Sequence, residues 1–283
     1  MIDLHTHTNE SDGSCPPFEL IDQALARGLE AMAISDHDTF AGYDQAAPAA
    51  QAYGLDLVCA IELSARLTGQ RQRDIHLLGY FLKQPPSAEF RAWLEELQAQ
   101  RRERNLGLVA KLQSQGVDIQ LSEVERVGRS LTGRPHFARV LVRKGYAANT
   151  EEAFRKYLGP SAPSFVERNA PDVGVGIKKI ADGGGLPVVA HPVRLGIRDA
   201  LAEEALIAEL RELGLRGLEV YHSDHQPPDV ARYIKIVNKY RMAVTGGSDF
   251  HGDHRPQVAL GTGLNRNLNI PRSVLDCLRQ ISN

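Results

Sequence analysis

Short runs of apolar, strand-forming residues alternate with segments of helical periodicity along most of this 283-residue chain. Between the first two such runs, Phe18, Ile21, Leu25 and Leu29 recur at helical spacing, which predicts a helix over Pro17–Leu29. The runs that predict strands are Ile2–His7, Ala31–Ser35, Leu57–Glu62, Ile75–Phe81, Leu186–Ala190, Gly217–Tyr221 and Met242–Gly246. This alternation predicts a parallel α/β fold, either a barrel of the (β/α) kind or an open doubly wound sheet. No GxGxxG or GxxxxGK[ST] segment follows any strand, which weakens the nucleotide-binding form of the open sheet.

The middle of the chain interrupts this alternation. Its pattern is helical throughout, and Pro85-Pro86 and Gly159–Pro163 mark its two edges. The helices expected there are Ser87–Gln115, Ser122–Val127, Arg134–Lys144 and Thr150–Leu158. We therefore predict a helical insertion over residues 85–169, between barrel segments formed by residues 1–84 and 170–283.

The composition is that of an ordinary globular protein, with 42% hydrophobic and 24% charged residues. A formal net charge of -2 gives no global field that would attract nucleic acid or a membrane surface. Cys15, Cys59 and Cys277 are few and far apart, which argues against a disulfide framework and predicts a reducing, cytoplasmic location. Residues 99–168 contain 13 Lys or Arg against 7 Asp or Glu, so the insertion is basic within an otherwise acidic protein.

Histidines and carboxylates lie at or just past the ends of the predicted strands. His5 and His7 are two residues apart on a strand, so their side chains point to the same side. In a barrel of parallel strands such ends meet at one face. The candidate metal ligands are His5, His7, Asp12, His37, Glu62, His76, His191, Asp249 and His251. Imidazole and carboxylate ligands without thiolate suit Mn²⁺, Zn²⁺ or Fe²⁺, and nine ligands imply two or three ions.

Four segments, Asp3–Thr8, Ser35–Thr39, Ala190–Pro192 and Ser248–His251, resemble the four motifs of the PHP (polymerase and histidinol phosphatase) domain, in that family's order. The resemblance implies an α/β fold of the distorted (β/α)7, TIM-like barrel type with a trinuclear metal centre. The helical insertion is similar to that of a stand-alone phosphoesterase subgroup, whose members are 3',5'-nucleoside bisphosphate phosphatases or 5'→3' exonucleases on RNA.

The same resemblance implies how the ligands are divided among the ions. One ion would be held by His5, His7, Glu62 and Asp249, and a second by Glu62, His76 and His191. The third would be held by Asp12, His37 and His251. Many family members have histidine where this chain has Asp12, and a carboxylate there favours Mn²⁺ over Zn²⁺.

The basic insertion supplies candidate substrate ligands. Thr132–Phe137 looks like a helix start, where free backbone N–H groups and basic side chains attract phosphate. The candidate substrate-binding residues are Arg101, Arg104, Asn105, Arg134, His136 and Arg194. The candidate catalytic histidines are His37, His191 and His222, and the leaving-group proton donor stays open between His191, His222 and Asp38.

The resemblance predicts a metal-dependent phosphatase that removes the 3'-phosphate of nucleoside 3',5'-bisphosphates through a hydroxide held between two metal ions. The second hypothesis is a 5'→3' exonuclease on short oligoribonucleotides. It ranks lower because only 6% of residues are aromatic and only Phe137 lies among the basic residues. Hydrolysis of histidinol phosphate and a non-catalytic metal-bound binding module are the further alternatives. We expect a small anionic nucleotide as partner, no membrane and no obligate protein partner.

Overall fold

The computed structural model describes residues 1–68 and 73–281. Its main sheet has seven strands in the order of the sequence, so each strand lies beside the next one along the chain. The strands are β1 (Ile2–Asp3), β2 (Ala31–Ile34), β3 (Asp56–Leu67), β4 (Arg73–Phe81), β5 (Leu186–Val189), β6 (Gly217–His222) and β7 (Ala243–Gly247). The predicted α/β barrel class is therefore confirmed.

The first and last strands meet and nearly close the barrel. Leu4 N donates to Gly246 O at 3.2 Å, and Asp249 N donates to His5 O at 2.8 Å. Gly247 permits this approach, because a β-carbon there would lie 2.2 Å from the backbone nitrogen of His5. Closure brings the polar residues that follow β1 against those that follow β7.

The expectation that all strands run parallel is wrong for β4. It pairs antiparallel with both β3 and β5, with His76 opposite Ser64. β3 ends at Leu67 and β4 begins at Arg73, whereas a crossover between parallel strands needs a dozen or more residues. His76 consequently reaches the metal face from the first half of its strand and Glu62 from the middle of β3, whereas the other candidate ligands lie in the segments that follow β1, β2, β5 and β7.

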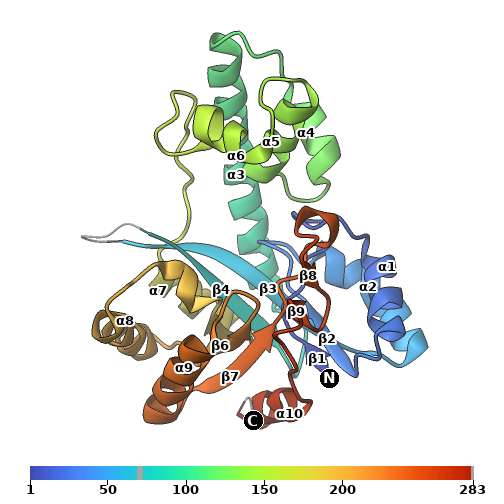
Figure 1. The fold of residues 1–283 in the computed structure, drawn as a ribbon, viewed down its shortest axis with the longest axis vertical. Coiled ribbons are helices and arrows are strands. Elements are labelled where there is room, and N and C mark those ends of the chain that lie inside the picture. The colour runs from blue at the N-terminus through green and yellow to red at the C-terminus, as the bar shows by residue number, and fades with distance from the viewer. Residues whose placement is uncertain (69–72, 282–283) are drawn as a thin grey trace.

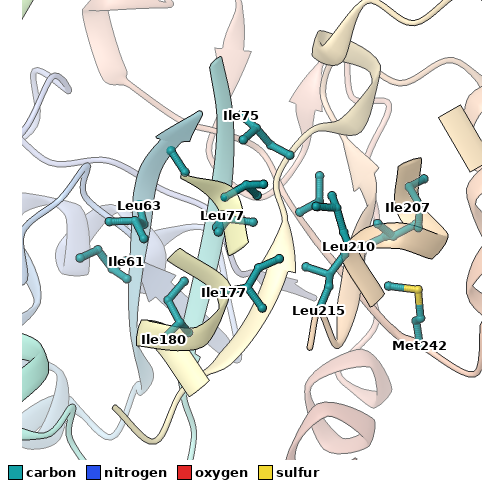
Figure 2. Packing of buried hydrophobic residues seen from close by; sticks show 14 of the residues in the cluster. Ile61, Leu63, Ile75, Leu77, Ile177, Ile180, Ile207, Leu210, Leu215 and Met242 are labelled. Atoms are coloured by element: carbon teal, nitrogen blue, oxygen red, sulfur yellow. The ribbon is translucent and has the colours of Figure 1, made fainter. Parts of the chain in front are cut away.

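Helices surround the barrel (Figure 1). They are α1 (Pro17–Ala26), α2 (Ala41–Tyr53), α7 (Val173–Asp182), α8 (Ala200–Glu212), α9 (Pro227–Tyr240) and α10 (Ser273–Ile281). Figure 2 shows the side chains of β3 and β4 packed against those of α7, with the side chains of α8 beyond them. The short elements near the metal face are η2 (Pro192–Leu195), η3 (Gly252–His254), β8 (Val258–Ala259) and β9 (Gly263–Leu264).

The insertion rises above the barrel in Figure 1. It consists of α3 (Ala88–Ser114), α4 (Leu121–Gly128), α5 (Arg134–Arg143) and α6 (Thr150–Ala153), which continues as a π-helical turn, η1 (Phe154–Leu158). Phe90 and Leu94, near the start of α3, pack in the barrel core, whereas Leu108 and Leu112 pack in a separate core with Phe137. One long helix thus connects the two cores. No helix in residues 1–68 or 73–281 has the length and apolar content that a membrane span needs.

Candidate active site

Four buried side chains, from β3 and from the segments that follow β1 and β7, converge at the mouth of the barrel. They are His5, His7, Glu62 and Asp249, and their ligand atoms all lie within 4.8 Å of one another. The Nε2 atoms of His5 and His7 are 3.1 Å apart, and His7 Nε2 is 3.0 Å from Glu62 Oε2 and 3.3 Å from Asp249 Oδ1. Two imidazole nitrogens that face each other and two carboxylates form a set of lone pairs that a cation stabilises.

Glu62 lies between two groups of histidines. Its Oε2 is 3.3 Å from His5 Nε2 and 3.3 Å from His37 Nδ1. Its Oε1 is 2.8 Å from His76 Nδ1 and 2.7 Å from His191 Nε2. Burial favours the neutral acid, but the imidazoles of His37, His76 and His5 hold the pKa of Glu62 well below its ordinary value. The carboxylate is therefore ionised, and each of its two oxygens faces histidines.

A third group of candidate ligands surrounds Asp12. Its carboxylate lies 3.2 Å from His251 Nε2, 3.6 Å from His37 Nε2 and 3.6 Å from His7 Nδ1. Its side chain is 18% exposed, in contrast to the fully covered His5 and His7. A third ion at this position would therefore lie nearest to solvent.

The backbone is strained where it presents these side chains. Asp38, His191 and Asp249 adopt φ of 47°, 29° and 57°, a region that residues other than glycine rarely occupy. Each follows the end of a strand, so the strain turns the side chain toward the mouth of the barrel. Such strain persists only where surrounding contacts hold it, and Asp249 N is held by its hydrogen bond to His5 O.

The sequence analysis missed Glu219, a fully buried carboxylate on β6. Its Oε1 is 2.8 Å from His5 Nδ1, and its Oε2 accepts from His191 N at 2.6 Å. Although burial opposes ionisation, His5 and His222 lower the pKa of Glu219 to about 2. This contact places the proton of His5 on Nδ1 and leaves Nε2 free for a metal. The available signal was an acidic residue inside the apolar run Gly217–Tyr221.

Glu219→Gln is expected to weaken divalent-metal binding by about 10- to 100-fold, because the amide is a poorer acceptor for the proton on His5. Titration of Mn²⁺ into the purified variant by calorimetry would measure this loss. Glu203→Gln is the matched control, because Glu203 is equally buried but contacts Arg232 and Tyr233 on the outer helices. Equal affinities in the variant and the wild type would contradict the role given to Glu219.

The residues present fit divalent metal ions. His7 Nδ1, His37 Nδ1 and His222 Nε2 are buried and have no hydrogen-bond partner among the described residues. Buried polar atoms normally have a partner, so these orphaned nitrogens indicate ligands for an ion. The nitrogen and oxygen donors, with no thiolate among them, suit Mn²⁺, Zn²⁺ or Fe²⁺ alike.

The electrostatics of the proton-donor candidates differ. Burial lowers the pKa of His37 to about 4 and that of His191 to about 3, so both rings are neutral at pH 7. His222 is buried, and its Nε2 is 3.5 Å from Asp249 Oδ2. Asp38 accepts from Ser64 N and pairs with Arg101, and despite burial Arg101 and Arg168 lower its pKa. Asp38 is therefore ionised and holds α3 against the barrel, which removes it as a proton donor.

A basic pocket adjoins the metal face beneath α3 and α5. Its volume is about 120 Å³, and its lining includes Asp12, His37 and His76 from the barrel together with arginines of the insertion and the segment after it. These are Arg101, Arg104, Arg134 and Arg168. Within the described chain, neither Arg104 nor Arg134 has a hydrogen bond or an ion pair with a carboxylate.

Arg101 pairs with Asp38, and Arg168 Nη2 lies 3.7 Å from Asp38 Oδ2, whereas a bound anion would stabilise the guanidinium groups of Arg104 and Arg134. Burial and the nearby Arg101 lower the pKa of Arg104 to about 9 and that of Arg168 to about 10, so both remain charged at pH 7. Confined like charges without counterions are costly unless a ligand supplies the opposite charge. Phosphate oxygens match the planar donor geometry of arginine.

Two of the predicted substrate ligands in the insertion, and the aromatic residue among them, have structural partners. His136 is buried, and both ring nitrogens are engaged: Nδ1 accepts from Gly133 N at 2.9 Å, and Nε2 lies 2.8 Å from Ser11 O. Asn105 donates to Thr132 O at 3.0 Å and is buried inside the insertion. Phe137 is fully buried in the insertion core. The two ring nitrogens of His136, the amide nitrogen of Asn105 and the ring of Phe137 are therefore used by the fold, whereas Oδ1 of Asn105 is buried without a hydrogen-bond partner among the described residues.

Arg194 lies at the metal face, in contact with the candidate ligand Asp249, as expected, and has a neighbour that the sequence analysis missed. Arg194 and Arg255 both contact Asp249 Oδ2, at 2.7 and 2.6 Å. Asp224 holds the pair, accepting from Arg194 Nε at 2.8 Å and from Arg255 at 3.1 Å. Two guanidinium groups are therefore fixed at the rim, and a further cavity of about 320 Å³ lies between them and the ligand residues.

Histidines and carboxylates lie together at the mouth of the barrel, with arginines on either side of them. This is a metal-dependent hydrolase that acts on phosphoester bonds. The chain belongs to the PHP domain family, whose model matches residues 3–152. A crystal structure of a metal-dependent phosphoesterase from Bifidobacterium adolescentis superposes with a TM-score of 0.82 at 32% identity, covering 98% of this chain and 96% of that one.

The relatives carry different substrate names. The chain is 32% identical to a 5'-3' exoribonuclease of Haemophilus influenzae, over 88% of this chain and 89% of that one. It is 31% identical to a 3',5'-nucleoside bisphosphate phosphatase of Chromobacterium violaceum, over 88% and 87%. It is also 30% identical to a phosphoribosyl 1,2-cyclic phosphate 1,2-diphosphodiesterase of Eggerthella lenta, over 88% and 94%. The class of reaction is shared, whereas the substrate differs from one relative to the next.

Proposed function

We propose that this enzyme removes the 3'-phosphate of nucleoside 3',5'-bisphosphates and releases the nucleoside 5'-monophosphate and phosphate. The observation that carries the proposal is the pair Arg104 and Arg134, which have no carboxylate partner in residues 1–68 and 73–281 and lie in a pocket shared with the candidate ligands His37 and His76. A substrate with a second phosphate would supply the missing counterion a short distance from the ester that is cleaved. The Chromobacterium relative is named for such a substrate.

We assign each of the three groups of side chains to one metal ion. His5, His7, Glu62 and Asp249 would hold one ion, Glu62, His76 and His191 a second, and Asp12, His37 and His251 a third. Bound divalent ions, with Mn²⁺ favoured by the carboxylate of Asp12, would neutralise phosphate oxygens and lower the pKa of water to a value at which it attacks phosphorus.

The chain's own residues would position the two phosphates. Arg194 and Arg255, fixed by Asp224, would bind oxygens of the phosphate that is transferred. Arg104, Arg134 and Arg168 would bind the phosphate that stays on the nucleoside. Residues 85–169 would act as a lid over the barrel, held by the pairing of Arg101 with Asp38 and by the contact of His136 with Ser11 O. His222 is the remaining candidate to protonate the leaving oxygen.

A 5'→3' exonuclease activity on short oligoribonucleotides is the second candidate. The same basic pocket would hold a 5'-phosphate while the next phosphodiester lies over the metal ligands. The Haemophilus relative is named for this activity. A histidinol phosphate substrate offers only one phosphate and would leave Arg104 and Arg134 without a partner.

Steady-state kinetics on three substrates test the proposal. With Mn²⁺ present, kcat/KM for adenosine 3',5'-bisphosphate should exceed that for phenyl phosphate by at least about 100-fold, because charge-assisted contacts to a second phosphate contribute about 1.5–3 kcal/mol each. Turnover of a 5'-phosphorylated trinucleotide, compared with that of the bisphosphate, tests the exonuclease candidate. Excess chelator should abolish turnover of all three substrates. Equal turnover of the bisphosphate and phenyl phosphate would refute the assignment.

A further inference from the structure

A larger cavity continues from the basic pocket, away from the metal ligands. Its volume is about 340 Å³, and it lies between the β3–β4 hairpin and the segment that leaves the insertion. Ser64, His76, Arg134 and Arg168 line both cavities, so the two are contiguous. A ligand with a phosphate at Arg134 could therefore extend into the larger cavity while it remains in contact with the protein.

Phe165 provides an aromatic wall in this cavity. The guanidinium carbon of Arg134 lies 5.7 Å from the centroid of its ring. The segment around Phe165 is held in place: Lys111 Nζ donates to Phe165 O at 2.7 Å, and Arg168 donates to Ser64 O at 2.7 Å. The ring is half-buried. It is therefore positioned before any ligand arrives, which reduces the entropic cost of binding.

The chemistry of the lining favours a flat, polar ring as ligand. One aromatic face and an adjacent guanidinium plane are the elements with which proteins bind bases of single-stranded nucleic acid. Charged side chains line the rest of the cavity. Arg66 pairs with Glu167, and Asp74 is exposed at the rim.

We propose that this cavity binds the base of the substrate nucleoside, which stacks against Phe165 beside Arg134. The inference rests on the proposed function, because it takes the ligand to be a nucleotide whose phosphate lies on the arginines of the basic pocket. It assigns to Phe165 the role of aromatic platform that the sequence analysis considered only for Phe137. Phe165 determines preference for nucleotides over other phosphate esters and takes no part in the chemical step.

Phe165→Leu keeps an apolar side chain of similar bulk and removes the flat face. For adenosine 3',5'-bisphosphate we expect KM to rise roughly 5- to 150-fold with kcat nearly unchanged, the range that loss of one stacked base implies. KM for the abasic analogue 1-deoxyribose 3,5-bisphosphate should stay the same, and Phe165→Trp should retain wild-type KM on both. Phe18→Leu, at a 54% exposed site on α1, is the matched control.

Equal losses on the nucleotide and the abasic substrate, or no loss on either, would overturn the assignment of the cavity. Failure of the proposed function gives a different result, because the wild-type enzyme would then have equal kcat/KM for phenyl phosphate and for the bisphosphate. Calorimetric titration with adenosine 5'-monophosphate tests the base site independently of the proposed function. Weaker binding in Phe165→Leu than in wild type supports the base site whatever the turnover, and equal binding refutes it.

Discussion

Glu62→Gln is expected to lower kcat for every phosphoester substrate by about a thousand-fold or more, because loss of a metal-centred stabilisation of several kcal/mol has that effect on rate. Both oxygens of Glu62 are used: Oε2 faces His5, His7 and His37, and Oε1 faces His76 and His191. The neutral amide keeps the size of the side chain but removes the charge that two neighbouring ions would share.

Measurement of kcat at saturating Mn²⁺, together with metal content by plasma emission spectrometry, checks this prediction. The variant should lose bound metal as well as activity. Glu203→Gln again serves as the control, because it neutralises a buried carboxylate of the same barrel away from the metal face. Wild-type kcat and metal content in Glu62→Gln would contradict the position we give to Glu62 between two ions.

Arg104→Met is expected to lower kcat/KM for a nucleoside 3',5'-bisphosphate by roughly 10- to 150-fold, the cost of one charge-assisted contact to phosphate. Turnover of phenyl phosphate should not change, because that substrate has no second phosphate. The melting temperature should stay the same or rise. The guanidinium of Arg104 is buried, its Nε has no partner, and removal of an uncompensated buried charge does not destabilise a protein.

Differential scanning calorimetry and kinetics on the two substrates provide the measurements. Arg102→Met is the control: Arg102 is the neighbour of Arg104 on α3, but its side chain is 60% exposed and pairs with Glu125 at the surface. A surface ion pair of this kind contributes little, so both stability and activity should change only slightly. A lower melting temperature in Arg104→Met, or an equal loss on both substrates, would show that Arg104 supports the fold and not the substrate.

Much of the metal face was predictable from residue spacing. The predicted strand Ile2–His7 is shorter in the structure, where β1 ends at Asp3, but His5 and His7 in the segment after it still face the same group of ligand atoms. The groups after β2, β5 and β7 follow strands whose carboxyl ends meet in any parallel barrel. Glu219 escaped prediction because a single acidic residue in an apolar strand has no local signature. Its role depends on His5, which lies 214 positions away in the chain.

The insertion was less predictable, because a helix start or a basic residue can serve folding or binding equally well. His136 and Asn105 satisfy backbone groups, and Phe137 fills the insertion core. Phe165 lies in the irregular segment after η1, where periodicity offers no guide, and its neighbour Arg134 precedes it by 31 positions. Burial and hydrogen-bond partners show whether such a residue serves folding or binding, and these two properties arise only when the chain folds.

By itself, the sequence determined the α/β class, the helical segment in the middle of the chain and the candidate metal ligands near the predicted strand ends, because periodicity is a local property of the chain. The choice of a barrel over an open sheet rested on the resemblance of four motifs to the PHP domain. Tertiary structure alone decided the reversed direction of β4, the contacts of Glu219 and the two sides of the site, with Arg194 and Arg255 on one and Arg104 and Arg134 on the other. These depend on contacts between residues far apart in the chain. Such contacts form only when the barrel closes between β1 and β7 and α3 packs across it.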